Sequence, residues 1–146
     1  MKNTPVYRWI KNNLPDTCLL CLASPDGTQD DICHACLADL PWQHACCARC
    51  AMPLPHASAR CGRCLAKPPA FCHAVVPLLY RFPLDALITA FKYHRHNRYG
   101  LLLARLLADY LEQHLAEPGA LVPELLLPIP MPPKRQAQRG YNQAFE

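Results

Sequence analysis

The apolar positions of residues 84–115 repeat with the period of a helix. From Leu84 onward they recur at helical spacing and predict one helix, and a second amphipathic helix is expected to continue to about Leu115. Tyr99–Gly100 is expected to interrupt the pattern between the two helices, and Pro118–Gly119 is expected to end it. The positions that carry the two patterns are Leu84, Leu87, Ile88 and Phe91, then Leu103, Leu106, Leu107, Tyr110 and Leu111.

Two apolar segments, residues 74–81 and Leu125–Leu127, are expected to form strands. In the first, Pro77 cannot donate a ladder hydrogen bond, so an edge position or a bulge is expected. The second is too short and too continuously apolar for a surface helix, which favours a buried strand. Pro128–Pro130 ends this strand and begins a rigid loop. Strands and helices in this order are typical of an α/β domain.

Residues 16–67 have a much sparser apolar pattern. Large apolar side chains are few there, whereas ordering a chain costs about 1.5 kcal/mol per residue. So thin a core cannot offset this cost by itself. A structural zinc ion contributes on the order of 10–16 kcal/mol in small peptides, and two such ions would stabilise the segment. We therefore expect bound metal to form its core.

Four Cys-x-x-Cys pairs supply the ligands that such a core needs. The two-residue spacer lets both thiolates of a pair face one ion, and two pairs complete a tetrahedral Zn²⁺ site of four sulfurs. A disulfide framework and a redox-active pair are the alternatives. Nothing in the sequence indicates export, however, and no pair lies in a βαβ pattern. The eight predicted ligands are Cys18, Cys21, Cys33, Cys36, Cys47, Cys50, Cys61 and Cys64.

The sequence leaves open how these ligands divide between two zinc ions. Sequential pairing closes the shortest loops and costs the least loop entropy, so it is favoured. A crossed arrangement, in which the first pair joins the third and the second joins the fourth, uses the same eight ligands. In either case Cys46 and Cys72 are left over and are expected to be unligated thiols.

Composition and charge narrow the class of protein only slightly. The chain has 146 residues, of which 18% are charged, and a formal net charge of +4. This balance is compatible with anionic ligands but does not by itself indicate nucleic acid. Residues 1–14 lack the continuous apolar region of a signal peptide, and no apolar run reaches the roughly eighteen residues of a membrane span. A soluble cytoplasmic protein is expected, with residues 1–15 as an N-terminal segment that includes a short helix at residues 5–13.

A basic segment, Met131–Arg139, follows the second predicted strand. After it, Gly140 permits a sharp backbone turn, and Asn142 is expected to be the N-cap of a further helix. Ligands of open α/β sheets bind outside the carboxyl ends of strands, and helix N-termini suit phosphate. The pattern therefore predicts a phosphate or pyrophosphate site, with a solvated basic loop as the alternative. Its cations are Lys134, Arg135 and Arg139.

Several short motifs follow the cysteine pairs in a characteristic order. They are Leu65-Ala66-Lys67-Pro68-Pro69, Tyr80-Arg81-Phe82-Pro83-Leu84, Leu87-Ile88-x-x-Phe91-Lys92-Tyr93, Pro128-Ile129-Pro130 and Arg139-Gly140-Tyr141-Asn142-Gln143. This order resembles the ComF family. The resemblance implies a double zinc ribbon at residues 16–67, joined to a type I phosphoribosyltransferase domain of Rossmann-like fold at residues 70–146. It also implies a role in DNA uptake during natural competence and in the use of DNA as a nutrient.

The resemblance assigns roles to the basic segment as well. In that fold, the loop after the first core strand contacts the pyrophosphate of phosphoribosyl pyrophosphate. Lys134, Arg135 and Arg139 would therefore meet the pyrophosphate, while Asn142 and Gln143 would hold the loop or the start of the helix. A full-length relative would also use Mg²⁺.

One motif of the family is missing from the sequence. No apolar strand followed by Asp-Asp-x-x-Thr-Thr-Gly, which would cradle the ribose 5-phosphate, occurs in residues 1–146. Asp30–Asp31 is no substitute, because it lies inside the zinc segment. The phosphoribosyltransferase-like part is therefore expected to be incomplete, and the chain to be a truncated homologue that is inactive as an enzyme by itself.

A second hypothesis treats the chain as a zinc-ribbon binding module. It rests on basic residues near the last two cysteine pairs and on the basic, partly aromatic segment Lys92–Arg98. Its partner would be single-stranded DNA or a protein of the competence machinery, and DNA binding would weaken steeply with salt. A solvated surface is the simpler interpretation of both groups of charges. A third hypothesis is a zinc-stabilised docking element that has no ligand of its own.

Overall fold

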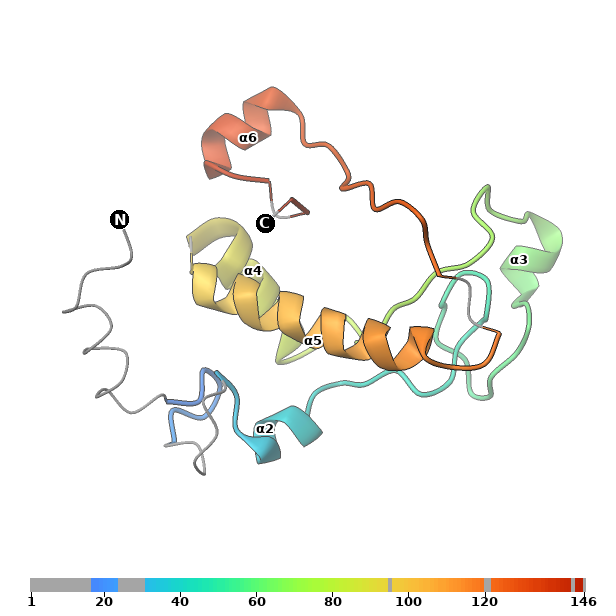
Figure 1. Cartoon of the computed structure of the whole chain (residues 1–146), viewed down its shortest axis with the longest axis horizontal. Coiled ribbons are helices and arrows are strands. Elements are labelled where there is room, and N and C mark those ends of the chain that lie inside the picture. The colour runs from blue at the N-terminus through green and yellow to red at the C-terminus, as the bar shows by residue number, and fades with distance from the viewer. Residues whose placement is uncertain (1–16, 24–30, 95, 120–121, 143, 146) are drawn as a thin grey trace. The chain divides into compact units, whose positions relative to one another are not determined.

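The computed structural model describes residues 17–23, 31–94, 96–119, 122–142 and 144–145 (Figure 1). The chain divides after Leu40 into two compact units, which are described separately here. The expected helix at residues 5–13 lies outside the described residues. Within them, the helices are α2 (His34–Ala38), α3 (Gly62–Ala66), α4 (Leu84–His94), α5 (Asn97–Leu115) and α6 (Pro133–Arg139).

The first unit is built around one group of cysteines and α2. Cys33 is the N-cap of this helix, and its side chain accepts a hydrogen bond from the Cys36 backbone N–H. The Cys18 side chain is fully buried, and Ile32 and Leu40 are also buried. A short helix and a few apolar residues therefore surround the thiols, as expected for a segment whose core is a metal site.

The second unit contains a similar cysteine core. Cys47, Cys61 and Cys64 are buried together, and Cys50 and Leu54 pack against them. Cys61 is the N-cap residue of α3. The sequence had indicated that this part of the chain lacks a large apolar core, and the structure agrees, because four of these five packed residues are cysteines of the Cys-x-x-Cys pairs.

The strand expected at residues 74–81 is reduced to one bridge. Trp42 and Leu78 form an isolated antiparallel bridge, in which the Gln43 N–H donates to the Pro77 carbonyl and the Leu79 N–H donates to the Pro41 carbonyl, both at 2.8 Å. Pro41 and Pro77 have no N–H to donate, so the ladder cannot continue through them. The strand prediction is therefore wrong, although the pairing point lies within the expected segment.

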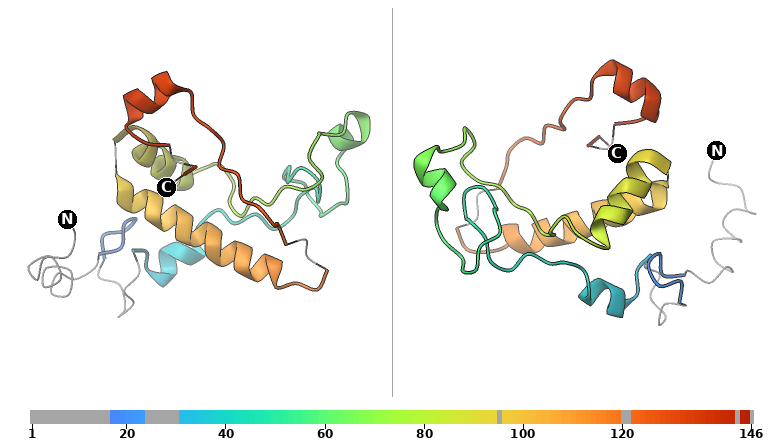
Figure 2. Two further views of the ribbon diagram at one scale, coloured as in Figure 1. Left: turned by 45° about the horizontal axis from the view of Figure 1, so that its top comes forward. Right: turned by 180° about the vertical axis from the view of Figure 1, so that it is seen from behind.

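Helices α4 and α5 contact each other and run side by side (Figure 2). Helix α4 ends at His94 and α5 begins at Asn97, so Tyr99–Gly100 lies inside α5. The predicted position of the interruption is thus wrong. An added Cβ atom on Gly100 would lie only 2.4 Å from the Phe91 ring, which shows that this glycine permits close approach of α4 rather than a break in the helix.

The apolar faces of α4 and α5 supply the core of the helical region. Leu84 and Leu87 are buried on α4, and Leu102 and Leu106 are buried on α5. The buried face of α5 differs from the expected one, because Leu107, which was expected on that face, is 43% exposed. The spacing of Leu102 and Leu106 places both side chains on one face, one helical turn apart.

The second predicted strand, Leu125–Leu127, is neither a strand nor buried in the structure. Its three leucines are 71%, 82% and 80% exposed, and they pair with no strand among the described residues. A buried strand requires neighbouring strands and a covering layer, and the described part of the chain provides neither. The prediction is wrong for these residues. Because the described residues contain isolated bridges but no sheet, the Rossmann-like domain stays a prediction.

Helix α6 occupies the segment for which a basic loop was expected. Pro133 begins the helix, where its missing N–H is not needed. Gly140 ends it in the left-handed conformation, at φ 85°, and its N–H donates to the Gln136 carbonyl. The expected sharp turn at Gly140 is confirmed. No helix of the described residues combines the length and apolar character that crossing a membrane requires.

Candidate metal centres and a cationic pocket

The first candidate metal centre consists of Cys18, Cys21, Cys33 and Cys36. Their four sulfur atoms lie within 4.8 Å of one another, and the Cys21 and Cys33 sulfurs are 3.7 Å apart. A zinc ion that binds four thiolates at about 2.3 Å in a tetrahedron separates the sulfurs by about 3.8 Å. The observed spacing therefore fits a zinc ion without rearrangement.

The second candidate metal centre consists of Cys47, Cys50, Cys61 and Cys64. These sulfurs also lie within 4.8 Å of one another. The Cys50 and Cys61 sulfurs are 3.7 Å apart, and the Cys47 and Cys64 sulfurs are 4.0 Å apart. The two clusters are suited to two structural zinc ions, and they confirm sequential pairing over the crossed arrangement.

The same backbone turn opens both metal centres. The Leu22 N–H donates to the Cys18 carbonyl, and the Ala51 N–H donates to the Cys47 carbonyl, each at 2.9 Å. Leu22 and Ala51 have positive φ angles, of 61° and 56°. This conformation is uncommon for residues other than glycine, so its repetition directly after the first Cys-x-x-Cys pair of each centre marks a turn that the metal sites require.

A short helix closes each metal centre. Cys33 precedes α2 and Cys61 precedes α3, and both have extended backbone conformations, with φ near −77° in each case (−76° and −78°). The last cysteine of each centre, Cys36 or Cys64, lies in the first turn of that helix, where side chains are tilted toward the helix N-terminus and so toward the preceding cysteine. The sequence therefore encodes each centre as one turn and one short helix.

Backbone hydrogen bonds lower the pKa of one thiol of the second centre. Backbone N–H groups, that of Cys50 most strongly, lower the pKa of the Cys47 thiol to about 6 against the opposing effect of burial. One of these donors, the Cys61 N–H, lies 3.2 Å from the Cys47 sulfur. Burial, together with hydrogen bonds from the neighbouring thiols, raises the pKa of Cys64 to about 12.

The first centre has the same arrangement. Burial acts to raise the pKa of the Cys18 thiol, but backbone N–H groups, including those of Cys21 and Cys33, outweigh it and lower the pKa to about 6. In Cys36, burial and the neighbouring thiols raise the pKa. One thiolate thus forms readily in each cluster, whereas the thiols with the raised pKa, Cys36 and Cys64, need a bound cation to ionise at neutral pH.

The leftover thiols lie outside both centres, as predicted. Among the described residues, Cys46 and Cys72 belong to neither group that could hold a metal ion, and no histidine belongs to one. Cys46 is partly exposed and Cys72 is exposed. The eight paired cysteines therefore form the complete ligand sets of both centres.

Arg49 lies between Cys47 and Cys50 of the second metal centre and is not a solvated charge. Its Nη2 atom donates to the Pro69 carbonyl at 2.8 Å, and its Nε atom donates to the Phe71 carbonyl at 3.2 Å. The guanidinium therefore connects the segment that follows α3 to the turn between Cys47 and Cys50. This structural role accounts for one of the basic residues that the nucleic-acid hypothesis had used.

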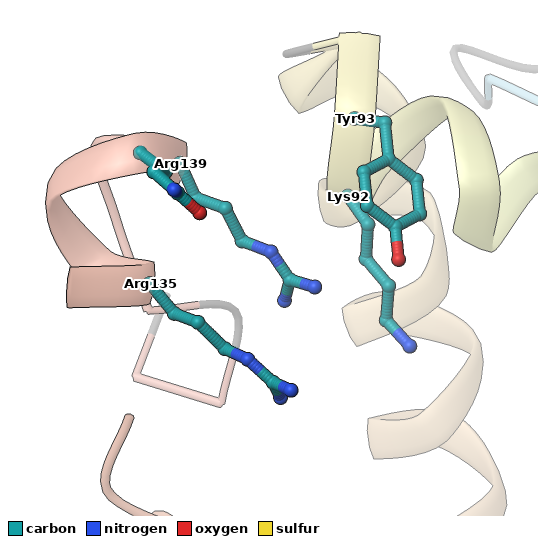
Figure 3. A pocket seen from close by; sticks show the side chains of 5 residues that line it. Lys92, Tyr93, Arg135 and Arg139 are labelled. Carbon is teal, nitrogen blue, oxygen red and sulfur yellow. The ribbon is translucent and has the colours of Figure 1, made fainter. Parts of the chain in front are cut away.

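A cationic pocket of about 380 Å³ lies between the end of α4 and helix α6 (Figure 3). The side chains of Arg135 and Arg139 extend from α6 toward α4, where Lys92 and Tyr93 face them. The Arg139 guanidinium lies over the Tyr93 ring, with its Cζ atom 5.3 Å from the ring centroid. Gln138 also lines it, so the lining that belongs to the described residues contains three cations and no carboxylate.

Aromatic packing holds the segment after α6 against α4. The rings of Phe91 and Tyr141 lie 5.5 Å apart, centroid to centroid, and the Tyr141 hydroxyl donates a hydrogen bond to the Phe91 carbonyl. Gly100 allows α5 to approach the same phenylalanine ring closely. Phe91 therefore links three segments that are far apart in the sequence, and it does so one residue before Lys92.

The structure brings together some of the residues predicted for a pyrophosphate site. Arg135 and Arg139 line the cationic pocket, whereas Lys134 lies on the same helix but does not line it. The Asn142 Nδ2 atom donates to the Ile129 carbonyl at 3.1 Å, and its Oδ1 atom accepts from the Ala144 N–H at 3.1 Å. The second bond is typical of an N-cap. Gln143 lies outside the described residues.

Sequence reasoning missed that Lys92 and Tyr93 join this pocket. It treated Lys92–Arg98 as a separate basic patch, because nothing in the spacing relates residues 92 and 139. The available signal was the Phe91-Lys92-Tyr93 motif together with the Tyr141 motif, which meet through the aromatic pair. Their contact depends on tertiary packing and could not be read from periodicity.

A second pocket, of about 420 Å³, adjoins the second zinc centre. Four rings form a stack along one side of it. Trp42 and Tyr110 lie 6.3 Å apart, Tyr110 and His114 lie 6.2 Å apart, and His114 and His73 lie 5.8 Å apart, all nearly parallel. Three of these four residues, all but Trp42, line the pocket, as do Cys46 and Cys47.

These metal centres define the class of the N-terminal part of the chain. Residues 10–65 match the family model of the double zinc ribbon domain, and each of the two clusters has the four thiols that one ribbon requires. The chain therefore contains a double zinc ribbon with two structural zinc sites.

Similarity to known proteins extends beyond the ribbon. Over 131 residues, the chain is 30% identical to the DNA utilization protein YhgH of Salmonella typhimurium strain LT2 and to that of Salmonella typhi. Each match covers 90% of this chain and 58% of the relative, so the chain spans somewhat more than half the length of the relatives it matches. No solved structure matches the chain.

Proposed function

We propose that the chain is a ComF-family protein with a role in DNA utilization, and that its cationic pocket binds the pyrophosphate group of phosphoribosyl pyrophosphate. The single observation that carries this proposal is the convergence of Arg135 and Arg139 with Lys92 on one pocket. The similarity to relatives called DNA utilization proteins supports it over 90% of the chain. The cytoplasm, where cysteines stay reduced and available to zinc, is the compartment we propose.

The chemistry of the pocket favours an anion with several negative charges. Three cations, Lys92, Arg135 and Arg139, line the pocket, and an anion with several negative charges attracts all three. Guanidinium groups bind phosphate oxygens in pairs of parallel hydrogen bonds. Because residues 1–146 contain no Asp-Asp-x-x-Thr-Thr-Gly motif, the proposal for these residues concerns binding, and Mg²⁺ with transfer chemistry belongs to a full-length relative.

Calorimetric titration of the zinc-loaded chain with pyrophosphate and with phosphoribosyl pyrophosphate tests the proposal. We expect both compounds to bind, and ribose 5-phosphate, which lacks the pyrophosphate group, to bind more weakly. Removing both guanidiniums in the Arg135→Gln/Arg139→Gln variant should weaken binding about 100-fold or more, since each charge-assisted contact contributes about 1.5–3 kcal/mol. Equal binding by the wild type and this variant would contradict the proposal.

Single-stranded DNA is a second candidate ligand, for which the ring stack beside the second zinc centre is the specific observation. Nucleobases stack on aromatic side chains without sequence preference, at about 1–3 kcal/mol per base. The stack of Trp42, Tyr110, His114 and His73 borders a pocket of about 420 Å³. Pockets of this size accept small planar ligands.

Fluorescence anisotropy with a labelled oligonucleotide tests this candidate. We expect binding that weakens with salt, and a roughly ten-fold loss in the His73→Ala/His114→Ala variant if a base stacks there. His56→Ala is the matched control, because His56 is exposed in the same zinc segment but does not line the pocket. Unchanged binding by the double variant would rule out the stack as a DNA site.

A further inference from the structure

We propose that Lys92 and Tyr93, at the end of α4, form the second wall of the anion site, so that the pyrophosphate group is held between α4 and α6. This inference rests on the proposed function because it concerns the same site. It assigns binding roles to two residues of α4, and it replaces Lys134 with Lys92 as the third cation that meets the ligand.

The geometry of the pocket carries this assignment. Lys92 and Tyr93 line it from α4, and Arg135, Gln138 and Arg139 line it from α6 (Figure 3). Lys134 has the same charge as Lys92 and belongs to α6, yet it is exposed and is not among the lining residues. Proximity in the sequence to the arginines is therefore a poor guide to which lysine contacts the anion.

Tyr93 has a different function from that of Lys92. Its ring holds the Arg139 guanidinium, whose Cζ atom lies 5.3 Å from the ring centroid. A guanidinium over an aromatic face is attracted by the ring, and its N–H groups remain able to donate hydrogen bonds to a ligand. Tyr93 therefore positions Arg139 within the pocket, and we regard it as a positioning residue rather than a ligand of the phosphate.

The two walls are fixed relative to each other by contacts next to the pocket. Phe91, adjacent to Lys92, packs on Tyr141 and accepts a hydrogen bond from its hydroxyl. Tyr141 follows Arg139 by two positions, with Gly140 ending α6 between them. These contacts hold the ends of α4 and α6 together, so that the cations meet without a ligand to draw them there.

The volume limits the chemical class of the ligand. Small-molecule pockets range from about 300 to 1,000 Å³, and this pocket, at about 380 Å³, is at the lower end. A pyrophosphate group with part of an attached sugar is a suitable occupant for a small, strongly cationic space.

A pair of charge-matched variants separates this inference from the proposed function. Pyrophosphate affinity of the zinc-loaded chain is measured for the wild type, Lys92→Gln and Lys134→Gln. We expect Lys92→Gln to lose about ten-fold or more in affinity, as for a charge-assisted hydrogen bond, and Lys134→Gln to change it less than about two-fold. The conservative variant Lys92→Arg should restore most of the affinity, which a purely structural role would not predict.

Two results would overturn the inference in different ways. Wild-type affinity in Lys92→Gln, together with a loss in Arg135→Gln/Arg139→Gln, would refute the second wall and leave the proposed pyrophosphate site intact. No binding of pyrophosphate by the wild type would refute both. Circular dichroism and zinc content show whether each variant is folded, and only a loss of affinity in a folded variant supports the assignment.

Two substitutions of Tyr93 test whether its aromatic ring positions Arg139. Tyr93→Phe keeps the aromatic face under Arg139 and should bind pyrophosphate like the wild type. Tyr93→Ala removes the face, and we expect about a three- to ten-fold loss, in line with the strength of a cation–aromatic contact. Equal affinities for the two variants would show that the ring does not position Arg139.

Discussion

Replacing Gly100 with alanine is expected to destabilise the helical region, although the same change usually stabilises a helix. Gly100 lies within α5, and a Cβ atom at this position would lie 2.4, 2.7 and 2.8 Å from three atoms of the Phe91 ring. Carbon atoms in contact are normally about 3.5–4.0 Å apart. The ring would have to move, but Tyr141 packs against it and restricts where it can go.

Two opposing terms set the magnitude for Gly100→Ala. The gain in helix propensity is about 0.8–1.0 kcal/mol. Overpacking of a well-filled contact costs about 1–3 kcal/mol, and three ring atoms within 2.8 Å point to the upper part of that range. The net change in the free energy of unfolding is therefore a loss of about 1–2 kcal/mol.

Urea denaturation of the zinc-loaded chain, followed by far-ultraviolet circular dichroism, measures this difference. Gly62→Ala is the matched control, because Gly62 is also in a helix but its added Cβ would have nothing within 4 Å. We expect that control to be neutral or slightly more stable than the wild type. If Gly100→Ala is as stable as Gly62→Ala, the close approach of α5 to Phe91 is not a packing constraint, and the reasoning fails.

Two further predictions concern the zinc segment. Zinc affinity should rise with pH, and it should fall as the pH drops toward 6 and below. The pKa of the Cys47 thiol is lowered to about 6 and that of the Cys64 thiol is raised to about 12, so protons compete with the metal for both thiols. Competition with a chelator measures the zinc affinity, and an affinity that does not depend on pH would contradict thiolate ligation. Arg49→Leu should destabilise the chain by about 1–2 kcal/mol through loss of its two hydrogen bonds to Pro69 and Phe71 carbonyls, whereas Arg60→Leu, at an exposed position, should be nearly neutral in the same denaturation assay.

Local patterns were sufficient where the interactions are themselves local. Each zinc site is formed by two pairs close in sequence, and the metal accepts only a few ligand types in one geometry, so spacing alone identified the eight ligands. The helix from Leu84 and the turn at Gly140 were likewise predictable, because periodicity and a positive φ angle are properties of short segments. The strands failed for the opposite reason, since a strand exists only with a partner, and Leu125–Leu127 has none among the described residues.

The amino-acid sequence by itself determined that this chain carries two four-cysteine zinc sites, since thiol spacing and the geometry of the metal leave few alternatives. Tertiary structure alone decided which basic residues share a pocket. Lys92 and Arg139 belong to distant segments, and their approach depends on the Phe91–Tyr141 contact. Packing between side chains remote in sequence has no periodic signature, so the composition of the cationic pocket could be known only from the folded chain.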